Sequence, residues 1–156
     1  MNTRGARFAS LITGSAAALL LACAAPASAQ SASPTGLWKT YSDRTGEADG
    51  LVRIVEQGGE FVGRVEKVFS PPNESPNPLC EKCSGELRDR PVVGMTILRG
   101  VRHAKDGYTE GTILDPDEGK DYRCTISLKE AGRRLEVRGF VGLPLLGRTQ
   151  VWTRVE

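Results

Sequence analysis

The sequence predicts an all-β fold: a single eight-stranded antiparallel barrel with no major helix. Apolar and polar residues alternate with a period of two in short segments that Gly, Pro, Asn and Asp interrupt, as in half-buried strands. No segment carries a helical apolar stripe, which disfavours a parallel sheet with crossover helices. The segments open on Gly36-Leu37-Trp38 and close on Trp152-Thr153-Arg154, a pattern typical of a closed barrel. An open sandwich of the same strands is the main alternative.

Residues 1–29 are predicted to form a secretory signal peptide. Arg4 and Arg7 precede an apolar stretch, and Ala27-Ser28-Ala29 provides a small-residue cleavage site before Gln30. The apolar stretch is too short to span a bilayer as a permanent anchor, and no second long apolar stretch follows it. We therefore expect a periplasmic or secreted protein whose mature chain has no transmembrane segment.

The same region offers a second interpretation. Leu20-Leu21-Ala22-Cys23 resembles the lipobox at which bacterial lipoproteins are cleaved and lipidated on cysteine. Leu21 fits that pattern imperfectly, and the site before Gln30 is a good ordinary cleavage site. A lipid anchor through Cys23 is the alternative to a released protein.

The expected mature chain, residues 30–156, has the size of one domain. Removing 29 of the 156 residues leaves 127, which is enough for one modest core. Two of the 21 basic residues and none of the 19 acidic ones precede the cleavage site, so the mature chain has 19 of each and a formal net charge of zero. A neutral chain without a Lys/Arg block lacks the electrostatic footprint of a nucleic-acid-binding protein.

Eight strands are expected in order along this domain. Turn signals such as Gly58-Gly59, Asp106-Gly107 and Ala131-Gly132 lie between most of them, and the short connections favour antiparallel neighbours. The expected strands are residues 36–42, 51–56, 60–69, 93–102, 107–114, 121–129, 133–141 and 148–155.

The alternation is clearest in three of these strands, where every second residue is apolar. The apolar faces consist of Tyr122, Cys124, Ile126 and Leu128; of Leu135, Val137 and Val141; and of Phe61, Val65 and Phe69. We expect each of these sets to share one face of its strand.

The stretch from Ser70 to Pro91 interrupts the alternation. It contains five prolines together with Asn73, Asn77 and Gly85, so it cannot be a regular strand, and it is long for a simple connection. Long loops in compact domains are often lids or binding loops. A lid and an irregular crossover held by a disulfide are both compatible with this stretch.

Cys80 and Cys83 lie in this stretch with the spacing of a thiol redox pair or of half a zinc site. A redox pair would be expected at the start of a helix, and a zinc site would need two more ligands, for which only Cys124 and His103 are available. Cys124 shares its face with apolar residues and is better explained as core. A structural disulfide, most simply between Cys80 and Cys83 or else between one of them and Cys124, is the preferred interpretation, and redox activity and metal binding remain open.

Two tryptophans lie in the first and last expected strands. Trp38 and Trp152 are neighbours if the barrel closes, and Arg154 can cover an indole ring by a cation–π contact. A packed closure element without a ligand role is the simpler interpretation.

Two charged clusters are candidate binding sites. Arg138, Arg148 and Arg154, with Arg133 and Arg134 nearby, could capture an anionic ligand, but Arg138 lies opposite the apolar positions and is expected to face outward. The acidic turn contains Asp115, Asp117, Glu118 and Asp121, and its spacing does not match an EF-hand loop.

The sequence provides little support for an enzyme. The mature chain has one His and no Gly-x-Ser-x-Gly elbow, so no Ser/His/Asp triad can be assigned. We predict no catalytic residue, no metal ligand and no cofactor.

Several segments together identify a family. They are Gly36-Leu37-Trp38-Lys39-Thr40, Cys80-Glu81-Lys82-Cys83-Ser84-Gly85-Glu86-Leu87, Pro91-Val92-Val93-Gly94-Met95-Thr96-Ile97-Leu98, Ile113-Leu114-Asp115-Pro116, Lys120-Asp121-Tyr122-Arg123-Cys124 and Gly147-Arg148-Thr149-Gln150-Val151-Trp152-Thr153-Arg154. In combination they resemble the bacterial family called domain of unknown function 2147, over about residues 34–156. The resemblance implies a secreted, periplasmic, lipocalin-like barrel and supplies neither a reaction nor a ligand.

The two ends of the domain are also similar to the general lipocalin pattern. In that pattern a Trp of the first strand and an Arg of the last strand close one end of the barrel, which implies a closure element made of Gly36, Trp38 and Arg154. The chain is shorter than typical lipocalins and shows no clear C-terminal helix.

We therefore expect a protein that binds a small apolar or amphipathic molecule inside the barrel. An eight-stranded barrel either holds one small ligand or is filled by its own side chains. The expected ligand contacts are Trp38, Phe61, Tyr122 and Trp152. The alternatives are a thiol-active envelope protein that uses Cys80 and Cys83, and a protein-interaction module that acts through the 70–91 loop or a sheet edge.

Overall fold

The computed structural model describes residues 32–156. The expected signal peptide, its cleavage site before Gln30 and the lipidation site at Cys23 lie outside the described residues and stay predictions. Within residues 32–156, no helix combines the length and the apolar character needed to cross a membrane.

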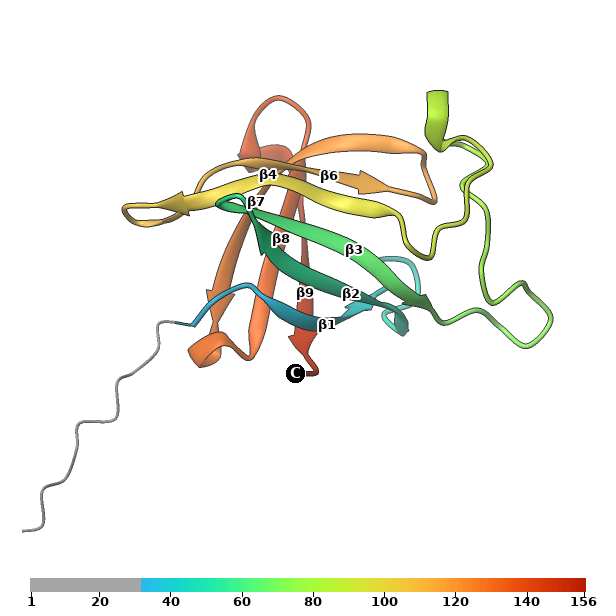
Figure 1. Cartoon of the computed structure of the whole chain (residues 1–156), viewed down its shortest axis with the longest axis horizontal. Helices are drawn as coiled ribbons and strands as arrows, with labels where there is room; N and C mark the ends of the chain where they lie inside the picture. Colours follow the sequence, from blue (N-terminus) through green and yellow to red (C-terminus); the bar gives the residue numbers. More distant parts are fainter. Residues whose placement is uncertain (1–31) are drawn as a thin grey trace, which may run out of the picture. The chain divides into compact units, whose positions relative to one another are not determined.

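The described chain forms a closed antiparallel barrel (Figure 1). Eight strands follow the order β3-β2-β1-β9-β8-β7-β6-β4, and the ring closes because β3 pairs with β4. The strands are β1 (Gly36–Tyr41), β2 (Ala48–Gln57), β3 (Glu60–Val68), β4 (Thr96–Ala104), β5 (Gly107–Tyr108), β6 (Gly111–Asp115), β7 (Lys120–Lys129), β8 (Arg134–Phe140) and β9 (Arg148–Arg154). The predicted barrel is confirmed, and the open sandwich is excluded.

Helical structure among residues 32–156 is limited to three 3₁₀ turns of three residues each. They are η1 (Gly85–Leu87), η2 (Glu130–Gly132) and η3 (Pro144–Leu146). The prediction of a barrel without a major helix is therefore confirmed.

The expected strand over residues 107–114 was wrong, because the chain breaks at Thr109. Its hydroxyl accepts a hydrogen bond from the Arg102 N–H at 2.9 Å, and its own N–H donates to the Arg102 carbonyl at 2.9 Å. These bonds hold the two-residue strand β5 against the end of β4, while β6 pairs separately with β4 through Leu98 and Ile113. The single strand expected over residues 107–114 is therefore two separate strands, β5 and β6.

Side chains alternate along the wall as the period-two pattern predicts. Cys124 and Ile126 of β7 are buried, whereas Arg123 and Lys129 are exposed. The alternation fails at Val141, which is 74% exposed because β8 ends at Phe140 and the chain leaves the wall there. The expectation that Val141 shares the apolar face of β8 was therefore wrong.

The interior of the barrel is filled by its own side chains. Trp38, Phe61, Leu98, Leu135 and Trp152 each expose at most 1% of their surface. Side chains with almost no exposed surface border neither solvent nor an internal void large enough for a water molecule. The deep interior is therefore a packed core.

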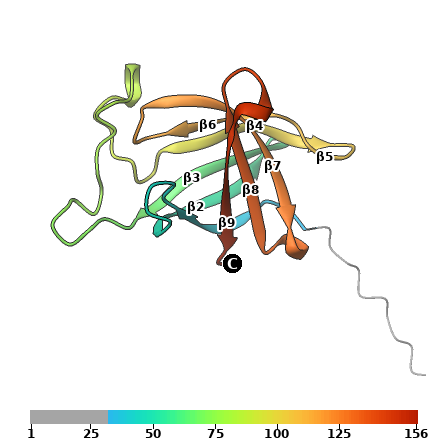
Figure 2. The same ribbon diagram turned by 180° about the vertical axis from the view of Figure 1, so that it is seen from behind.

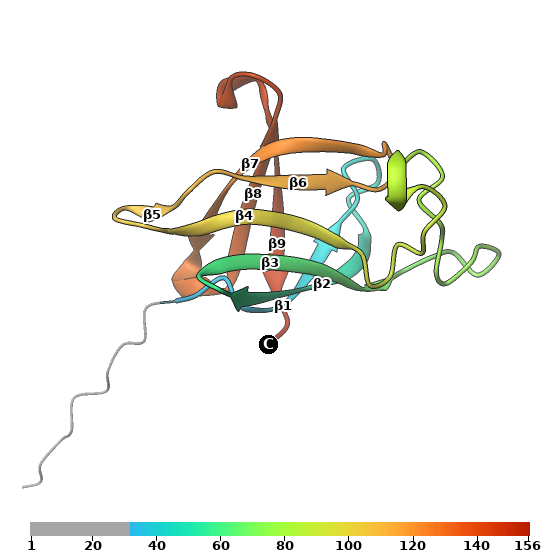
Figure 3. The ribbon, with the colours of Figure 1, turned by 45° about the horizontal axis from the view of Figure 1, so that its top comes forward.

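The two ends of the barrel differ. Because neighbouring strands run antiparallel, alternate connections lie at the same end. We call the end that carries connections 42–47, 69–95, 116–119 and 141–147 the loop end, and the opposite end, where β1 begins and β9 ends, the closed end (Figure 2, Figure 3).

Two inward-facing glycines test the packed interior. A Cβ added at Gly63 would lie 2.8 Å from the Leu98 Cβ, so we expect Gly63→Ala to destabilise the fold by about 1–3 kcal/mol through overpacking. At Gly139 the nearest atoms, on Ile113 and Tyr122, are 3.7 Å away, so Gly139→Ala should change stability by less than about 1 kcal/mol. Urea unfolding followed by tryptophan fluorescence measures both, and equal effects would contradict the packing described.

Candidate functional site

The guanidinium of Arg154 holds the closed end together. It donates three hydrogen bonds of 2.6 Å to backbone carbonyls: Nε to Gly132, Nη1 to Thr35 and Nη2 to Ser33. These carbonyls belong to the β7–β8 turn and to the segment before β1, so one side chain ties both to the end of β9. Removal from water lowers the pKa of Arg154 from its usual value, and the charge-assisted hydrogen bonds offset that cost.

Trp38 lies directly under this guanidinium. The Arg154 Cζ is 4.2 Å from the centre of the indole ring, and the Trp38 Nε1–H donates to the Pro34 carbonyl at 2.7 Å. Gly36 completes the arrangement, because a Cβ there would lie 2.4 Å from the Glu156 carbonyl oxygen and its φ of 132° favours glycine. The three residues of the expected closure element therefore lie together at one end.

Two of the other expected ligand contacts lie deep in the core. Phe61 packs edge-on against His103 and Tyr108, with ring centroids 4.8 and 5.5 Å apart. The Trp152 Nε1–H donates to the Gln150 side chain at 3.1 Å. Like Trp38, both are fully enclosed and border no space for a ligand in this conformation.

Tyr122 differs from these three because it is only half-buried at the loop end. It faces Ile113 across the β6–β7 ladder, and Ile113 is also half-buried. Both pack near Gly139, which has no side chain to fill the space between them. The inner wall is therefore partly accessible here.

Polar groups form a rim around Tyr122. Its hydroxyl donates to the Glu118 carboxylate, which lowers the pKa of Glu118 and raises the pKa of Tyr122. Arg148 lies 3.6 Å from Glu118 and 3.8 Å from Asp43. This chain of charges connects the β6–β7 turn, the start of β9 and the β1–β2 loop.

Asp49 adds a buried acid to the same end. It accepts a hydrogen bond from the Thr40 hydroxyl at 2.5 Å. Its pKa is raised, first by burial and further by the like charges of Asp117 and Asp43. The strands expected from the sequence leave Asp49 in the connection between residues 42 and 51, because it is the extra residue of a β-bulge whose position no local pattern reveals.

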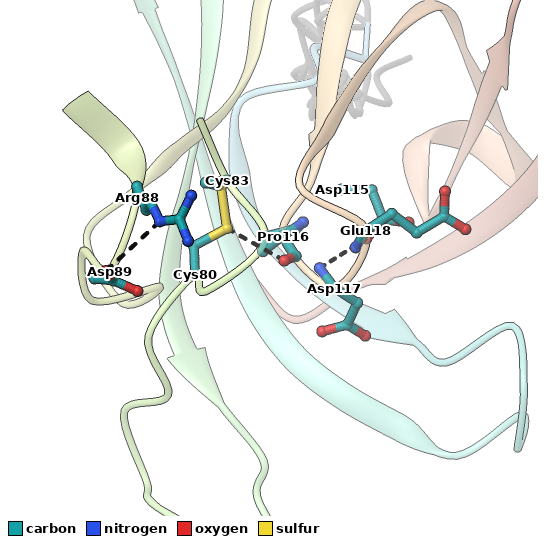
Figure 4. The surroundings of a disulfide bond; sticks show 8 residues. All are labelled: Cys80, Cys83, Arg88, Asp89, Asp115, Pro116, Asp117 and Glu118. Carbon is teal, nitrogen blue, oxygen red and sulfur yellow. Dashed lines mark hydrogen bonds and ion pairs between the residues drawn. A yellow bond between two sulfur atoms is a disulfide. The ribbon is translucent and has the colours of Figure 1, made fainter. Parts of the chain in front are cut away.

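The disulfide between Cys80 and Cys83 anchors the long β3–β4 connection (Figure 4). Both cysteines are buried, and the Cys80 Sγ contacts the Pro116 carbonyl at 3.2 Å. A Cβ on Gly119 would meet the Lys82 carbonyl oxygen at 2.1 Å, so the connection and the β6–β7 turn are in close contact. The preferred interpretation of the pair as a disulfide agrees with this structure, and the buried sulfurs do not favour thiol exchange.

The same connection covers part of the outer wall. Ile97 and Leu114 alternate with Leu98 and Ile113 along their strands, so they face away from the interior, yet both are buried. They join one apolar cluster with Cys80, Cys83, Val92 and Met95. The connection therefore packs against the wall, and a lid function for it stays a prediction.

The cysteine and histidine outside this pair are separated from it by their packing. Cys124 is fully buried on the inner face of β7 and forms no disulfide with another described residue. His103 packs against the Phe61 ring at the opposite end. Among residues 32–156, no three His, Cys, Asp or Glu side chains are grouped to hold a metal ion.

Side chains of the two charged clusters bind loops or the outer wall. Arg138 points outward, as expected, and binds the β8–β9 loop. The Asp115 carboxylate accepts from the N–H groups of Asp117 and Glu118 at 2.9 and 3.1 Å, so it shapes the acidic turn. Asp121 instead pairs with Arg99 on the outer wall at 2.7 Å.

A hollow of about 280 Å³ lies on the outer wall of β2 and β3. It is lined by Arg53, Val55, Gln57, Val62, Arg64, Val65 and Glu66. Arg53 is held by Glu66 at 2.8 Å and Glu156 at 2.6 Å. The hollow therefore belongs to the outside of the barrel and is separate from the loop-end rim.

Replacement of Arg154 tests the closed end. Arg154→Lys keeps the charge but cannot satisfy three diverging carbonyls, so we expect a loss of about 2–4 kcal/mol in the free energy of unfolding. Arg134→Lys, at the exposed arginine that begins β8 beside this turn, is the matched control and should change stability little. Equal stability of the two variants in urea unfolding would contradict the role given to Arg154.

Burial of Cys124 should make its thiol unreactive. Burial raises its pKa to about 12, so almost no thiolate exists at pH 8. We expect iodoacetamide to leave Cys124 unmodified in the folded protein and to alkylate it in guanidinium chloride, as peptide mapping by mass spectrometry would show. Rapid alkylation under native conditions would show that the core opens readily.

Comparison with known proteins places this fold in context. Protein HP1028 from Helicobacter pylori, described as belonging to the lipocalin family, superposes with a TM-score of 0.67 at 20% sequence identity. The match covers 80% of this chain and 84% of that chain, and it supports a lipocalin-like fold. No curated protein matches the sequence significantly.

A family model matches most of the described domain. Residues 36–154 match the family described as "Uncharacterized protein conserved in bacteria (DUF2147)". The match runs from the first residue of β1 to the last residue of β9, so it includes Gly36, Trp38 and Arg154 of the closed end, the disulfide and the loop-end rim. The chain belongs to the DUF2147 family, as the sequence motifs predict.

Proposed function

We propose that the chain is an exported binding protein of the periplasm or the extracellular medium, which takes a small amphipathic molecule at the loop end of its barrel. The observation that carries this proposal is the difference between the two ends. Arg154 and Trp38 seal one end, whereas the inner wall at the other remains half-exposed at Ile113 and Tyr122. A ligand would therefore enter from the loop end.

The chemistry of the rim favours an amphipathic ligand over a purely apolar one. Ile113 and the Tyr122 ring offer apolar contact on the inner wall. The Arg148 guanidinium is 65% exposed, and its carboxylate partners are no closer than 3.6 Å, so it can donate to a carboxylate, phosphate or carbonyl group of a ligand. The packed core below limits how far an apolar portion can extend.

Three of the four expected ligand contacts are enclosed in the core, and the fourth, Tyr122, is half-buried. Contact of a ligand with Trp38, Phe61 or Trp152 would require the core to open, because all three are enclosed. Tyr122 is the expected contact that a ligand reaches without such a change. The lipocalin-like fold supports ligand binding by analogy, and the site itself rests on the half-exposed wall and its rim.

A protein-interaction module is the second candidate. The filled interior favours it, because a barrel without a deep cavity can use its loops for binding. Residues 79–91 form a compact surface closed by the Leu79–Pro91 bridge and by a 2.9 Å hydrogen bond from the Cys80 N–H to the Arg90 carbonyl. A thiol-active protein is less supported, since both sulfurs of the pair are buried.

The first test is native mass spectrometry of the protein exported to the periplasm and purified gently. We expect a reproducible extra mass that disappears when the same sample is denatured. A bare polypeptide in repeated preparations would contradict a tightly held ligand and favour a protein partner.

A matched pair of tyrosine variants locates the site. With anilinonaphthalene sulfonate as the amphipathic probe, Tyr122→Ala should weaken binding by about tenfold, equivalent to about 1.4 kcal/mol. Tyr41→Ala is the control, because the Tyr41 hydroxyl binds Thr153 on the outer wall at 2.8 Å, away from the rim. Fluorescence titration gives both dissociation constants. Equal binding by folded Tyr122→Ala and unsubstituted protein would place the site elsewhere.

A further inference from the structure

We propose that the β8–β9 loop, residues 141–147, is an apolar tip that inserts into the surface of a lipid bilayer. Four aliphatic side chains project from this loop: Val141 is 74% exposed, Leu143 67%, Leu145 85% and Leu146 79%. The loop stands clear of the barrel wall (Figure 2, Figure 3). None of its seven residues is charged. The remaining exposed large apolar residues among residues 32–156 are scattered over the surface, as is normal.

The apolar tip is held in a fixed shape by one side chain. Arg138 donates from Nε to the Pro144 carbonyl at 2.7 Å, from Nη2 to the Leu145 carbonyl at 3.0 Å and from Nη1 to the Thr149 hydroxyl at 2.8 Å. Pro144 fixes the first position of the 3₁₀ turn. Gly147 packs so closely that a Cβ there would lie 2.4 Å from the Gly139 carbonyl oxygen. These contacts fix the conformation of the loop, and its apolar side chains point outward.

Several polar groups of the tip backbone are hydrogen-bonded within the protein. The Leu146 N–H donates to the Leu143 carbonyl and the Gly147 N–H to the Pro144 carbonyl, both at 3.1 Å. Arg138 occupies the Pro144 and Leu145 carbonyls, and Pro144 has no N–H to satisfy. A backbone that enters hydrocarbon must have its polar groups paired within the protein. Of residues 143–146, three carbonyls and the Leu146 N–H are paired in this way, which suits shallow insertion.

The composition and size of the tip favour lipid over a protein surface. The hot spots of protein interfaces are enriched in Trp, Tyr and Arg and poor in Leu and Val, whereas the large apolar side chains that this tip exposes are all Leu or Val. Four side chains are also far fewer than the about 20–30 residues per side of a standard interface, which disfavours a second copy of the chain. Insertion into lipid instead gains from each aliphatic side chain in proportion to the apolar area that it buries.

The charges around the base of the tip predict how the contact depends on lipid headgroups. Arg123 is paired with Glu110, and Arg148 lies between Glu118 and Asp43. Counted with Arg138, these arginines are matched in number by the carboxylates of Glu110, Glu118 and Asp43, so this group presents no net positive charge to an anionic surface. Binding should come from apolar insertion and depend weakly on salt and on anionic lipid. The inference does not depend on the proposed ligand site.

Flotation with vesicles of phosphatidylethanolamine and phosphatidylglycerol tests this proposal. Every variant carries the same N-terminal segment, so any contribution of that segment cancels. We expect the double variant Leu145→Ser/Leu146→Ser to lower the partition coefficient by more than ~10-fold, because two exposed aliphatic groups are lost. The matched control is Leu79→Ser/Leu87→Ser, which removes two exposed leucines from the 70–91 region and should partition like the unsubstituted protein.

A tryptophan probe reports insertion directly. In Leu145→Trp, the new indole should shift its emission to the blue and be quenched by brominated lipids, whereas Trp38 and Trp152 are enclosed and should not respond. No partitioning of the unsubstituted protein, or equal partitioning of the Leu145/Leu146 and Leu79/Leu87 variants, would overturn the proposal. A photo-crosslinker at position 145 that joins a second protein but not lipid would overturn it in favour of a protein groove.

Discussion

The hydrogen bonding of one guanidinium governs how this barrel is organised. Arg154 brings a charge into a half-buried site, a placement that is costly unless its donors find acceptors. Three carbonyls from two separate segments supply those acceptors, and the Trp38 ring covers one face of the cation. The start of the chain's first strand, the end of its last strand and the β7–β8 turn are thereby fixed to each other. With one end occupied in this way, accessible inner wall is left at the loop end.

The loop end combines features that no single strand carries. The rim brings together Asp43, Asp49, Asp117, Glu118 and Arg148 from two connections and two strand ends. The β3–β4 connection, which carries the disulfide, contacts the β6–β7 turn, and the apolar tip is the β8–β9 loop. The barrel wall thus acts as a rigid support, and the differences that matter for binding lie in the loops it presents.

The sequence predicts the wall well and the rim poorly, and the reason is physical. Period-two alternation is a local property, so burial of Cys124 and Ile126 follows directly from their positions in β7. The bulge at Asp49, the break at Thr109 and the end of β8 before Val141 depend on partners from elsewhere in the chain. The expected ligand contacts were chosen as inward aromatic residues. Alternation gives the direction of a side chain but not the depth of packing around it, which separates half-exposed Tyr122 from enclosed Trp38, Phe61 and Trp152.

The register of the wall has a mechanical consequence. β1 and β9 share only two residue pairs, and so do β4 and β6, whereas β2 and β3 share eight and β7 and β8 share seven. The two short seams divide the barrel into two four-stranded meanders, β1–β4 and β6–β9. The β1–β9 seam is reinforced by the Arg154 hydrogen bonds and by backbone bonds from Leu37 to residues 155 and 156, so the β4–β6 seam is the weaker of the two and the softer place in the wall. Leu98 and Ile113 pair across the β4–β6 seam on the inner face, so an opening there would extend the accessible wall beside Tyr122 toward the side of the barrel.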